Sequence, residues 1–533
     1  MLISKIMMKS KDSIRKVPRL FKSFGLDERE ASFIRHNKKI WCSFTSDKRD
    51  GEIIIESYDV AASIIAFSYF ANALAKKHNA RIKVCAKTPV GLEAKIYKWN
   101  NDKKYKSFGA VPFYYELSNY QSLEVENLFS KIYPRLRTKK DVEDLKVEGV
   151  WIGDLLYDSH LMRYRVPTVE IQDKRFHSSL REAIGYYIYW RDYFDSHNVK
   201  SVIASHCVYA RNAIILRIAV HRGIPAYQVN AFSLYHLTSE HLWAYNDFLS
   251  YPQMFKELSP QEQQEGLELA EARMERRFAG EVGVDMTYST RSAFIRNNNA
   301  KRVIRESPRI KILIATHCFF DAPHPFGVNL FPDLYEWLTF LGKISERTDY
   351  DWYVKTHPDF LPGNSETLES VVRNYPKITI IPKDTSHLQI VEEGINFVLT
   401  VYGTVGFEYA ALGIPVINTS LCNPHIGYNF NIHPKTVKEY EDILLKLKDQ
   451  KLDIDINKVY EYYYMHYIYD RGANWLVDNL INRIGGYNQQ RDPMVYKLFL
   501  DDFTTQRHEK ALRSLMNFID SGDFCFTKKH YNS

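Results

Sequence analysis

Short β-rich runs alternate with helix-length segments from about residue 50 onward. "GEIIIE" (51–56) has the composition of a strand, and "ARIKVCA" (80–86) is a second such run. Between them lies "VAASIIAFSYFANALA", which starts at Val60 and is apolar almost throughout, as expected of a buried helix. A strand, a helix and a strand in this order predict parallel pairing through a right-handed crossover.

The alternation continues to about residue 230 and restarts near residue 309. The first half adds a strand at 199–205, and the second half has strands "RIKILIAT" (309–316), "DWYVK", "KITIIP" and "INFVLTV". One predicted helix of the second half carries its apolar side chains on a single face: Leu334, Trp337, Leu338, Leu341 and Ile344. The pattern predicts the α/β class, with two facing doubly wound Rossmann-like domains joined by a helical connector.

The predicted boundaries follow changes in composition. Residues 259–308 are charged, helix-prone and then Asn-rich, which indicates a connector. We therefore expect a basic N-terminal extension (1–36), an N-terminal Rossmann-like domain (37–258), the connector (259–308), a C-terminal Rossmann-like domain (309–485) and a helical tail (486–533) that packs back on the N-terminal domain. The tyrosine-rich segment 460–476 is expected to serve core packing.

Charge is concentrated at the start of the chain. The net charge is +7, and between Met1 and Leu26 seven cationic residues face Asp12 alone. The remainder is nearly neutral, which argues against a nucleic-acid-binding protein. Apolar residues at near-helical spacing accompany these cations, so residues 1–26 fit a peripheral contact with an anionic inner membrane. The alternative is a solvated terminus interrupted by Pro18.

Cysteine usage and hydropathy indicate the compartment. The six cysteines form no Cys-x-x-Cys pair, which favours free thiols over disulfides or a zinc site. No apolar core and cleavage site follow the basic start, and the run from Val60 is shorter than the ~18 residues of a spanning helix. We expect a cytoplasmic protein.

Candidate chemistry begins with "TVYGTVGFEYAALGIPVINTS" (400–420), which predicts a strand, a turn and a short helix. Gly403 and Gly406 would let a phosphate approach the backbone, while Thr404 would cap the helix or donate to a phosphate oxygen. Glu408 lies one turn further on and suits a ribose hydroxyl. The alternative is an ordinary turn in which Thr404 caps the helix and Glu408 favours its dipole.

The segment "WYVKTHPD" ends a second strand with candidate phosphate ligands. Lys355 and His357 project to the same side of an extended chain, and Pro358 keeps His357 extended. A cation beside an imidazole suits a diphosphate or a departing phosphate. The alternative is a structural histidine in a turn.

The loop "THCFFDAPHPFG" (316–327) follows the first strand of the second half and is expected to face the other domain. Its His317, Asp321 and His324 are candidates to contact either substrate. They lack regular ligand spacing, so no metal site is predicted.

Two of these motifs, the end of the strand at Lys355 and the turn at Gly403, resemble those of a known family. "KTHP" followed by "GTVGFEYAALGIPVI" resembles bacterial capsule and surface polysaccharide glycosyltransferases of the GT-B architecture, particularly relatives of capsule Kdo transferases and sialyltransferase-like enzymes. The resemblance implies that His357 and Pro358 contact the phosphate of a nucleotide-sugar donor. It also implies that Gly403, Thr404 and Glu408 hold the nucleotide, although many relatives have serine at the position of Gly403.

The N-terminal domain is then expected to bind the acceptor and supply a general base. Asp158 and His206 are the leading candidates, and Glu56 with Asp59 is a further pair. Asp154 and Asp158 follow a short apolar run, and Arg163 lies nearby to orient an acidic substrate, so Asp154 and Arg163 are possible cleft-facing residues. "GDLLYDSHLMRY" also resembles a segment of the same enzymes, which favours Asp158. Each has a structural alternative as a cap, turn residue or salt bridge.

The expected activity is transfer of a sugar from a nucleotide-activated donor, such as CMP-linked Kdo, to a growing capsule or lipopolysaccharide glycan. No metal or other cofactor is required in this scheme, because helix dipole and side-chain cations stabilise the departing phosphate. The alternatives are a polyol-phosphate transferase or sugar-nucleotide 2-epimerase on the same scaffold, or a non-catalytic scaffold in capsule assembly.

Overall fold

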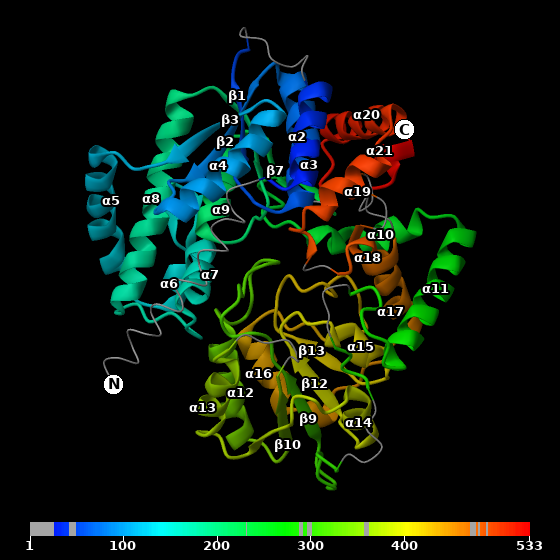
Figure 1. Ribbon diagram of the computed structural model, residues 1–533. Coiled ribbons are helices and arrows are strands. Elements are labelled where there is room, and N and C mark those ends of the chain that lie inside the picture. Colours follow the sequence, from blue (N-terminus) through cyan, green and yellow to red (C-terminus); the bar gives the residue numbers. More distant parts are fainter. Residues whose placement is uncertain are drawn as a thin grey trace, which may run out of the picture.

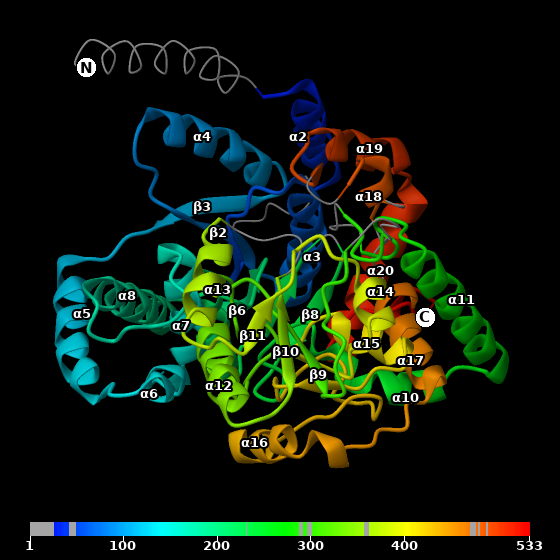
Figure 2. The same ribbon diagram turned by 90° about the horizontal axis from the view of Figure 1, so that it is seen from below.

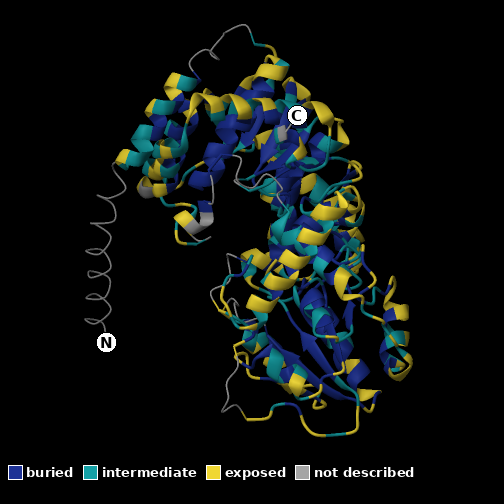
Figure 3. Ribbon diagram, turned by 90° about the vertical axis from the view of Figure 1, so that its right-hand side faces the viewer, coloured by how far each residue is buried: buried dark blue, intermediate teal, exposed yellow. Residues whose placement is uncertain are grey.

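The computed structural model describes residues 26–41, 49–230, 232–286, 291–295, 301–356, 362–469, 476–477, 480–486 and 489–532. Two α/β domains face each other, and the C-terminal helices return to the first domain (Figure 1). Figure 3 shows buried residues filling both sheets and exposed residues on the outer helix faces.

The N-terminal domain is built on a six-stranded sheet in the order β3-β2-β1-β6-β7-β8. Its strands are β1 (Glu52–Glu56), β2 (Arg81–Lys87), β3 (Ala110–Tyr115), β6 (Val199–Ala204), β7 (Ala226–Val229) and β8 (Leu234–Leu237). All neighbours pair parallel except β7 and β8, which are antiparallel. A separate two-stranded ribbon joins β4 (Lys146–Val147) to β5 (Val150–Trp151).

The C-terminal domain has a wholly parallel sheet in the order β11-β10-β9-β12-β13. The strands are β9 (Lys311–Ala315), β10 (Asp351–Lys355), β11 (Ile378–Ile380), β12 (Phe397–Thr400) and β13 (Val416–Asn418). Its helices are α12 (Leu334–Glu346), α13 (Asn364–Val372), α14 (His387–Glu392), α15 (Val405–Ala411) and α16 (Val437–Leu445).

Both sheets have the doubly wound strand order, so the predicted class of two facing Rossmann-like domains is confirmed. In each sheet the chain starts in the middle, builds one side and then crosses to the other. The change of direction lies between β1 and β6 in the first sheet and between β9 and β12 in the second. Loops leave this point in opposite directions and open a crevice, which is where such sheets bind ligands.

The remaining helices cover the sheets and join the domains. In the first domain they are α2 (Glu28–Ile40), α3 (Ala61–His78), α4 (Leu92–Ser107), α5 (Asn119–Ile132), α6 (Lys139–Glu143), α7 (Gly153–Tyr164), α8 (Lys174–Ser196), α9 (Ala210–His221) and α10 (Tyr251–Lys256). The connector contains α11 (Pro260–Phe278), and the chain closes with α17 (Ile456–Tyr463), α18 (Leu480–Arg483), α19 (Met494–Asp502), α20 (Thr505–Ser521) and α21 (Lys529–Asn532).

Helix α3 is apolar all round because both of its sides are covered. Every residue from Ala61 to Ala75 is buried. One side packs on the first sheet, and the other packs on α19 and α20 of the C-terminal tail. Figure 1 shows these last helices beside α3. The predicted buried helix is therefore confirmed, and part of its cover comes from more than 400 residues further along the chain.

The tyrosine-rich segment packs between the connector and the second domain. Tyr462 and Tyr463 of α17 are fully buried in a cluster with Phe407 of α15 and Met274 of α11. A single π-helical turn, Tyr464–Ile468, follows α17. The predicted packing role of these tyrosines is confirmed.

Within the described ranges, no helix combines the length and apolar character needed to cross a lipid bilayer. The five cysteines in these ranges are free thiols.

Candidate functional site

The crevice of the C-terminal sheet lies between the loops that follow β9 and β12. His317 follows β9; its Nε2 lies 3.3 Å from the hydroxyl of Thr400, and its ring stacks on Tyr402 at 4.7 Å. A Cβ added to Gly403 would lie 2.7 Å from Cε1 of His317. Gly403 is therefore needed for the close approach of this imidazole, a role the sequence does not reveal.

Lys355 ends the neighbouring strand β10. It pairs in register with Ala315 of β9, so its position lines up with the β9–β12 crevice. The residue is only 3% exposed, and its ammonium has no hydrogen-bond acceptor or ion-pair partner among the described residues. Burial lowers the pKa of Lys355 to about 8, although Glu408 and Asp384 oppose this shift. An unpaired buried cation is costly, so a site that keeps one is suited to an anionic ligand.

Glu408 lies on the same side of the sheet. Tyr353, two residues before Lys355, packs with Tyr409 of α15, so Lys355 projects toward that helix. Arg277 of the connector donates from Nε to Oε1 of Glu408 at 2.9 Å and pairs with the same oxygen through a second nitrogen. Oε2 keeps no hydrogen-bond partner among the described residues, and it remains an acceptor for a ligand hydroxyl.

Thr404 and Gly406 are the two other predicted residues of this turn, and their surroundings differ. Thr404 precedes α15 but makes no side-chain capping bond. Gly406 is buried, and a Cβ there would clash with Cε1 and Nδ1 of His425. The His425 ring therefore requires a glycine at position 406 for packing, and the expected approach of a phosphate to this backbone stays a prediction.

The loop after β11 adds a residue that the sequence analysis missed. Ser386 is 4% exposed, and its hydroxyl has no hydrogen-bond partner within the described part of the chain. β11 pairs with β10, so this hydroxyl belongs to the same carboxyl edge as Lys355. An isolated Ser carries no sequence signal, and only the strand order brings it here. His357 and Pro358 lie outside the described residues.

The loop after β9 reaches the N-terminal domain through His324. Its Nδ1 donates to Oδ1 of Asp158 at 2.6 Å, and its Nε2 donates to Oε1 of Glu143 at 2.8 Å. All three side chains are buried, and we call them the interdomain triad. Burial by itself lowers the pKa of His324, but the two carboxylates outweigh it and raise the pKa to about 10. The imidazole is therefore cationic at neutral pH.

The triad changes the interpretation of Asp158. Burial raises the pKa of Asp158 to about 6 against the opposing effect of His324. Oδ2 accepts from the backbone N–H of His324 at 3.3 Å, so both oxygens are engaged by the other domain. This geometry gives Asp158 a role in joining the domains. Its predicted role as a base stays a prediction that the geometry does not favour.

Other predicted residues lie along the same interface or away from it. Asp321 accepts from the hydroxyl of Tyr209 across the domains at 2.8 Å. Asp154 does not face a cleft as expected: it is 1% exposed and accepts from Arg217 at 2.7 Å inside the N-terminal domain. Arg163 is half-exposed and pairs with Glu182 on α8.

His206 lies at the crevice of the N-terminal sheet, between the loops that follow β1 and β6. It lines a cavity of about 360 Å³ together with Tyr58, Ser205, Asn230, Tyr245 and Arg491. Nε2 of His206 lies 3.4 Å from the hydroxyl of Tyr58. Burial lowers the pKa of His206, with Glu56 opposing, so the imidazole is neutral near pH 7. A neutral imidazole in a polar cavity can accept a proton.

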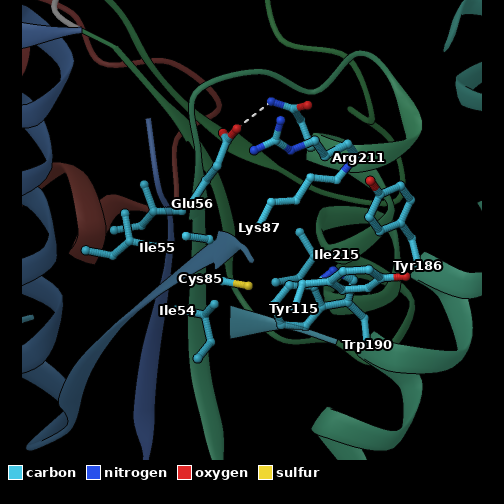
Figure 4. Close-up of a pocket in the computed structure, with 13 residues that line it drawn as sticks. Ile54, Ile55, Glu56, Cys85, Lys87, Tyr115, Tyr186, Trp190, Arg211 and Ile215 are labelled. Carbon is cyan, nitrogen blue, oxygen red and sulfur yellow. Dashed lines mark hydrogen bonds between the residues drawn. The ribbon is translucent and has the colours of Figure 1, made fainter. Parts of the chain in front are cut away.

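A second, smaller pocket of about 40 Å³ opens at the ends of β1, β2 and β3. Figure 4 shows Glu56, Lys87 and Arg211 gathered at one end and Trp190, Tyr115 and Ile215 at the other. Glu56 is held by Ser205, whose hydroxyl donates to it at 2.7 Å, and by the amide of Asn212 at 2.5 Å. These bonds fix the carboxylate between the pocket and the loop that carries His206.

Across the described ranges, no group of three or more His, Cys, Asp or Glu side chains is arranged to hold a metal ion.

No protein-family model and no curated protein matches the chain. Among solved structures, a glycosyltransferase from Rickettsia africae ESF-5 is 10% identical with a TM-score of 0.23, over 86% of this chain and 100% of that one. KpsC of Thermosulfurimonas dismutans, a beta Kdo 2,7 transferase, is 13% identical with a TM-score of 0.30, over 57% of this chain and 85% of that one. A UDP-GlcNAc 2-epimerase from Neisseria meningitidis is 9% identical with a TM-score of 0.20, and the match covers 77% of this chain and 97% of the epimerase. At these scores the similarities carry no conclusion about activity.

The interdomain triad predicts a pH-dependent stability. The pKa of His324 is raised from 6.5 to about 10, so its contribution is complete below pH 6.5 and is lost as the pH rises through 10. Between pH 7 and 9.5 the unfolding free energy of the wild type should fall with rising pH relative to His324→Gln, by at most roughly 1 kcal/mol per pH unit, because Asp158 takes up a proton more readily in the variant. Thermal unfolding of both proteins across this range measures the difference, and parallel curves would contradict a cationic His324.

Gly406→Ala tests the structural role of that glycine. The added methyl group must displace the buried ring of His425, so we expect a loss of about 1–3 kcal/mol in unfolding free energy. Gly413→Ala is unsuitable as a control because its φ is positive. Ala410→Gly on the same helix provides one, since it changes helix propensity without adding volume. Equal stability of Gly406→Ala and wild type in urea unfolding would show that the space is open.

Proposed function

We propose that the protein is a glycosyltransferase that takes its sugar from a nucleotide-activated donor bound at the carboxyl edge of the C-terminal sheet. The buried ammonium of Lys355, which has no hydrogen-bond or ion-pair partner among the described residues, carries the proposal. A phosphate beside it would supply the missing counter-charge and stabilise the group that departs when the sugar is transferred.

The surroundings of Lys355 suit the rest of a nucleotide. Among the described residues, neither Oε2 of Glu408 nor the hydroxyl of Ser386 has a hydrogen-bond partner. Oε2 can accept from a ribose hydroxyl, and the Ser386 hydroxyl can donate to a phosphate oxygen. Arg277 holds Glu408 in place from the connector. His357 and Pro358 are proposed, from the motif alone, as further contacts to the phosphate.

The acceptor is proposed to bind the N-terminal domain in the cavity lined by His206. The acceptor hydroxyl oxygen attacks the anomeric carbon, the imidazole takes its proton, and the nucleotide leaves with the electrons of the broken C–O bond. Tyr58 and Tyr245 supply aromatic walls against which a sugar ring can pack.

We further propose a CMP-linked acidic sugar such as Kdo as the donor and a capsule or lipopolysaccharide glycan as the acceptor. This finer assignment rests on the resemblance of "KTHP" and "GTVGFEYAALGIPVI" to capsule enzymes. A peripheral contact of residues 1–26 with an anionic membrane would bring the enzyme to a glycolipid acceptor.

Lys355→Met tests the donor site. Removing an unpaired buried charge should leave the ligand-free Tm at least as high as in the wild type, while stabilisation by CMP is lost. Thermal shift with CMP, CDP, UDP and GDP measures both effects, and Lys343→Met, an exposed lysine of α12, is the matched control. If no nucleotide stabilises the wild type, the proposed donor site is wrong and a scaffold role is favoured. Preference for UDP would overturn the CMP assignment alone.

His206→Asn tests the base. We expect kcat to fall by about 10²–10⁴-fold while the CMP-dependent Tm shift is unchanged. Because burial lowers the pKa of His206, wild-type activity should persist below pH 6.5 before it declines. The exposed His221→Asn is the control. Retention of full activity by His206→Asn would assign the base to another group.

A further inference from the structure

One face of α4 carries exposed apolar and cationic side chains together. With 3.6 residues per turn, Leu92, Lys95, Trp99, Lys103 and Lys106 fall on a single stripe along the helix. Leu92 is 64% exposed and Trp99 57% exposed, and Lys95 and Lys106 are exposed beside them. We call these five residues the α4 stripe. None of its positions carries an acidic residue.

The α4 stripe is not needed to hold the helix in place. The opposite side anchors α4 through the buried Tyr105 and through Lys104, which pairs with Glu30 of α2 at 3.0 Å. Asp102 is turned inward, where it pairs with the buried Lys98. Asp102, which precedes Lys103 of the stripe, is thus neutralised on the other side of the helix. The second acidic residue of α4 is Glu93, next to Leu92 in the sequence.

Within the stripe the two kinds of side chain already associate. Nζ of Lys103 lies 3.1 Å from the centre of the Trp99 ring. Just before the helix, Val90 is 90% exposed. Exposed Trp and Leu with interleaved lysines are the side chains that partition into the headgroup region of an anionic bilayer.

The position of α4 makes this face accessible. Figure 2 shows α4 at the rim of the N-terminal domain, outside β3. Helix α2 contacts α4 from the inner side through the Glu30–Lys104 pair, which leaves the α4 stripe uncovered by it.

We propose that the α4 stripe is a docking surface for an anionic lipid bilayer, with Leu92 and Trp99 entering the interface and the three lysines contacting lipid headgroups. Charge complementarity favours an anionic bilayer over a neutral membrane or a protein groove without acidic residues. Each lysine close to an anionic surface adds its own favourable electrostatic contribution to binding. Helix α5 offers the contrast: Tyr120 and Leu123 are 74% and 67% exposed, but residues 119–130 contain Glu124 and Glu126 and no Lys or Arg.

Co-sedimentation of the full chain with phosphatidylcholine vesicles, with and without phosphatidylglycerol, tests the surface. We expect binding only to vesicles that contain phosphatidylglycerol. Lys95→Glu/Trp99→Ser/Lys106→Glu should reduce the partition coefficient by about tenfold or more. Tyr120→Ser/Leu123→Ser on α5 is the matched control, and it should bind like the wild type.

Each other outcome overturns the docking surface. Unchanged binding of the triple variant would assign membrane contact to residues outside α4, and equal binding to neutral vesicles would remove the role of the lysines. Absence of any vesicle binding by the wild type would leave the stripe to a protein partner. Far-UV circular dichroism and Tm of the triple variant, expected to match the wild type, separate loss of the surface from loss of the fold.

Discussion

A protonated imidazole enclosed between two carboxylates fixes how the two domains face each other. His324 enters the N-terminal domain from the loop after β9 and donates to Asp158 on α7 and Glu143 on α6. Breaking one partner of such a buried group leaves an uncompensated charge, which costs several kcal/mol. The triad therefore resists both sliding and separation of the domains. Because it holds the loop after β9, it also fixes the C-terminal crevice relative to the cavity of His206.

The triad and Lys355 show two uses of buried charge in one molecule. In the triad every charged group has a partner, so the arrangement stabilises one domain placement. At Lys355 the ammonium is buried without a hydrogen-bond partner among the described residues, and burial lowers its pKa, which is the sign of an unfavourable environment for the charge. A functional site tolerates such a cost when a ligand supplies the missing charge. This contrast favours Lys355 over Asp158 as the centre of the chemistry.

Several site residues were predictable and others were not, for reasons of distance along the chain. "DWYVK" predicts the bounds of β10, and a lysine at the end of a strand in a doubly wound sheet is a candidate ligand from its position alone. The packing of Gly406 against the His425 ring was not predictable, because the ring belongs to a separate loop after β13. Asp154 was assigned to a cleft because its partner Arg217 lies 63 residues away. Ser386 carried no signal until the pairing of β11 with β10 placed it.

The sequence by itself determined the class of the fold, the two alternating halves and the strand ends where the candidate ligand-binding residues lie, because these depend on local periodicity and on the direction of parallel strands. The tertiary structure decided which charged groups are paired. Arg277 reaches Glu408 across 131 residues, and His324 reaches Asp158 across 166. Pairing and burial are set by contacts between distant segments, and they separate a structural charge from one that is free to hold a ligand.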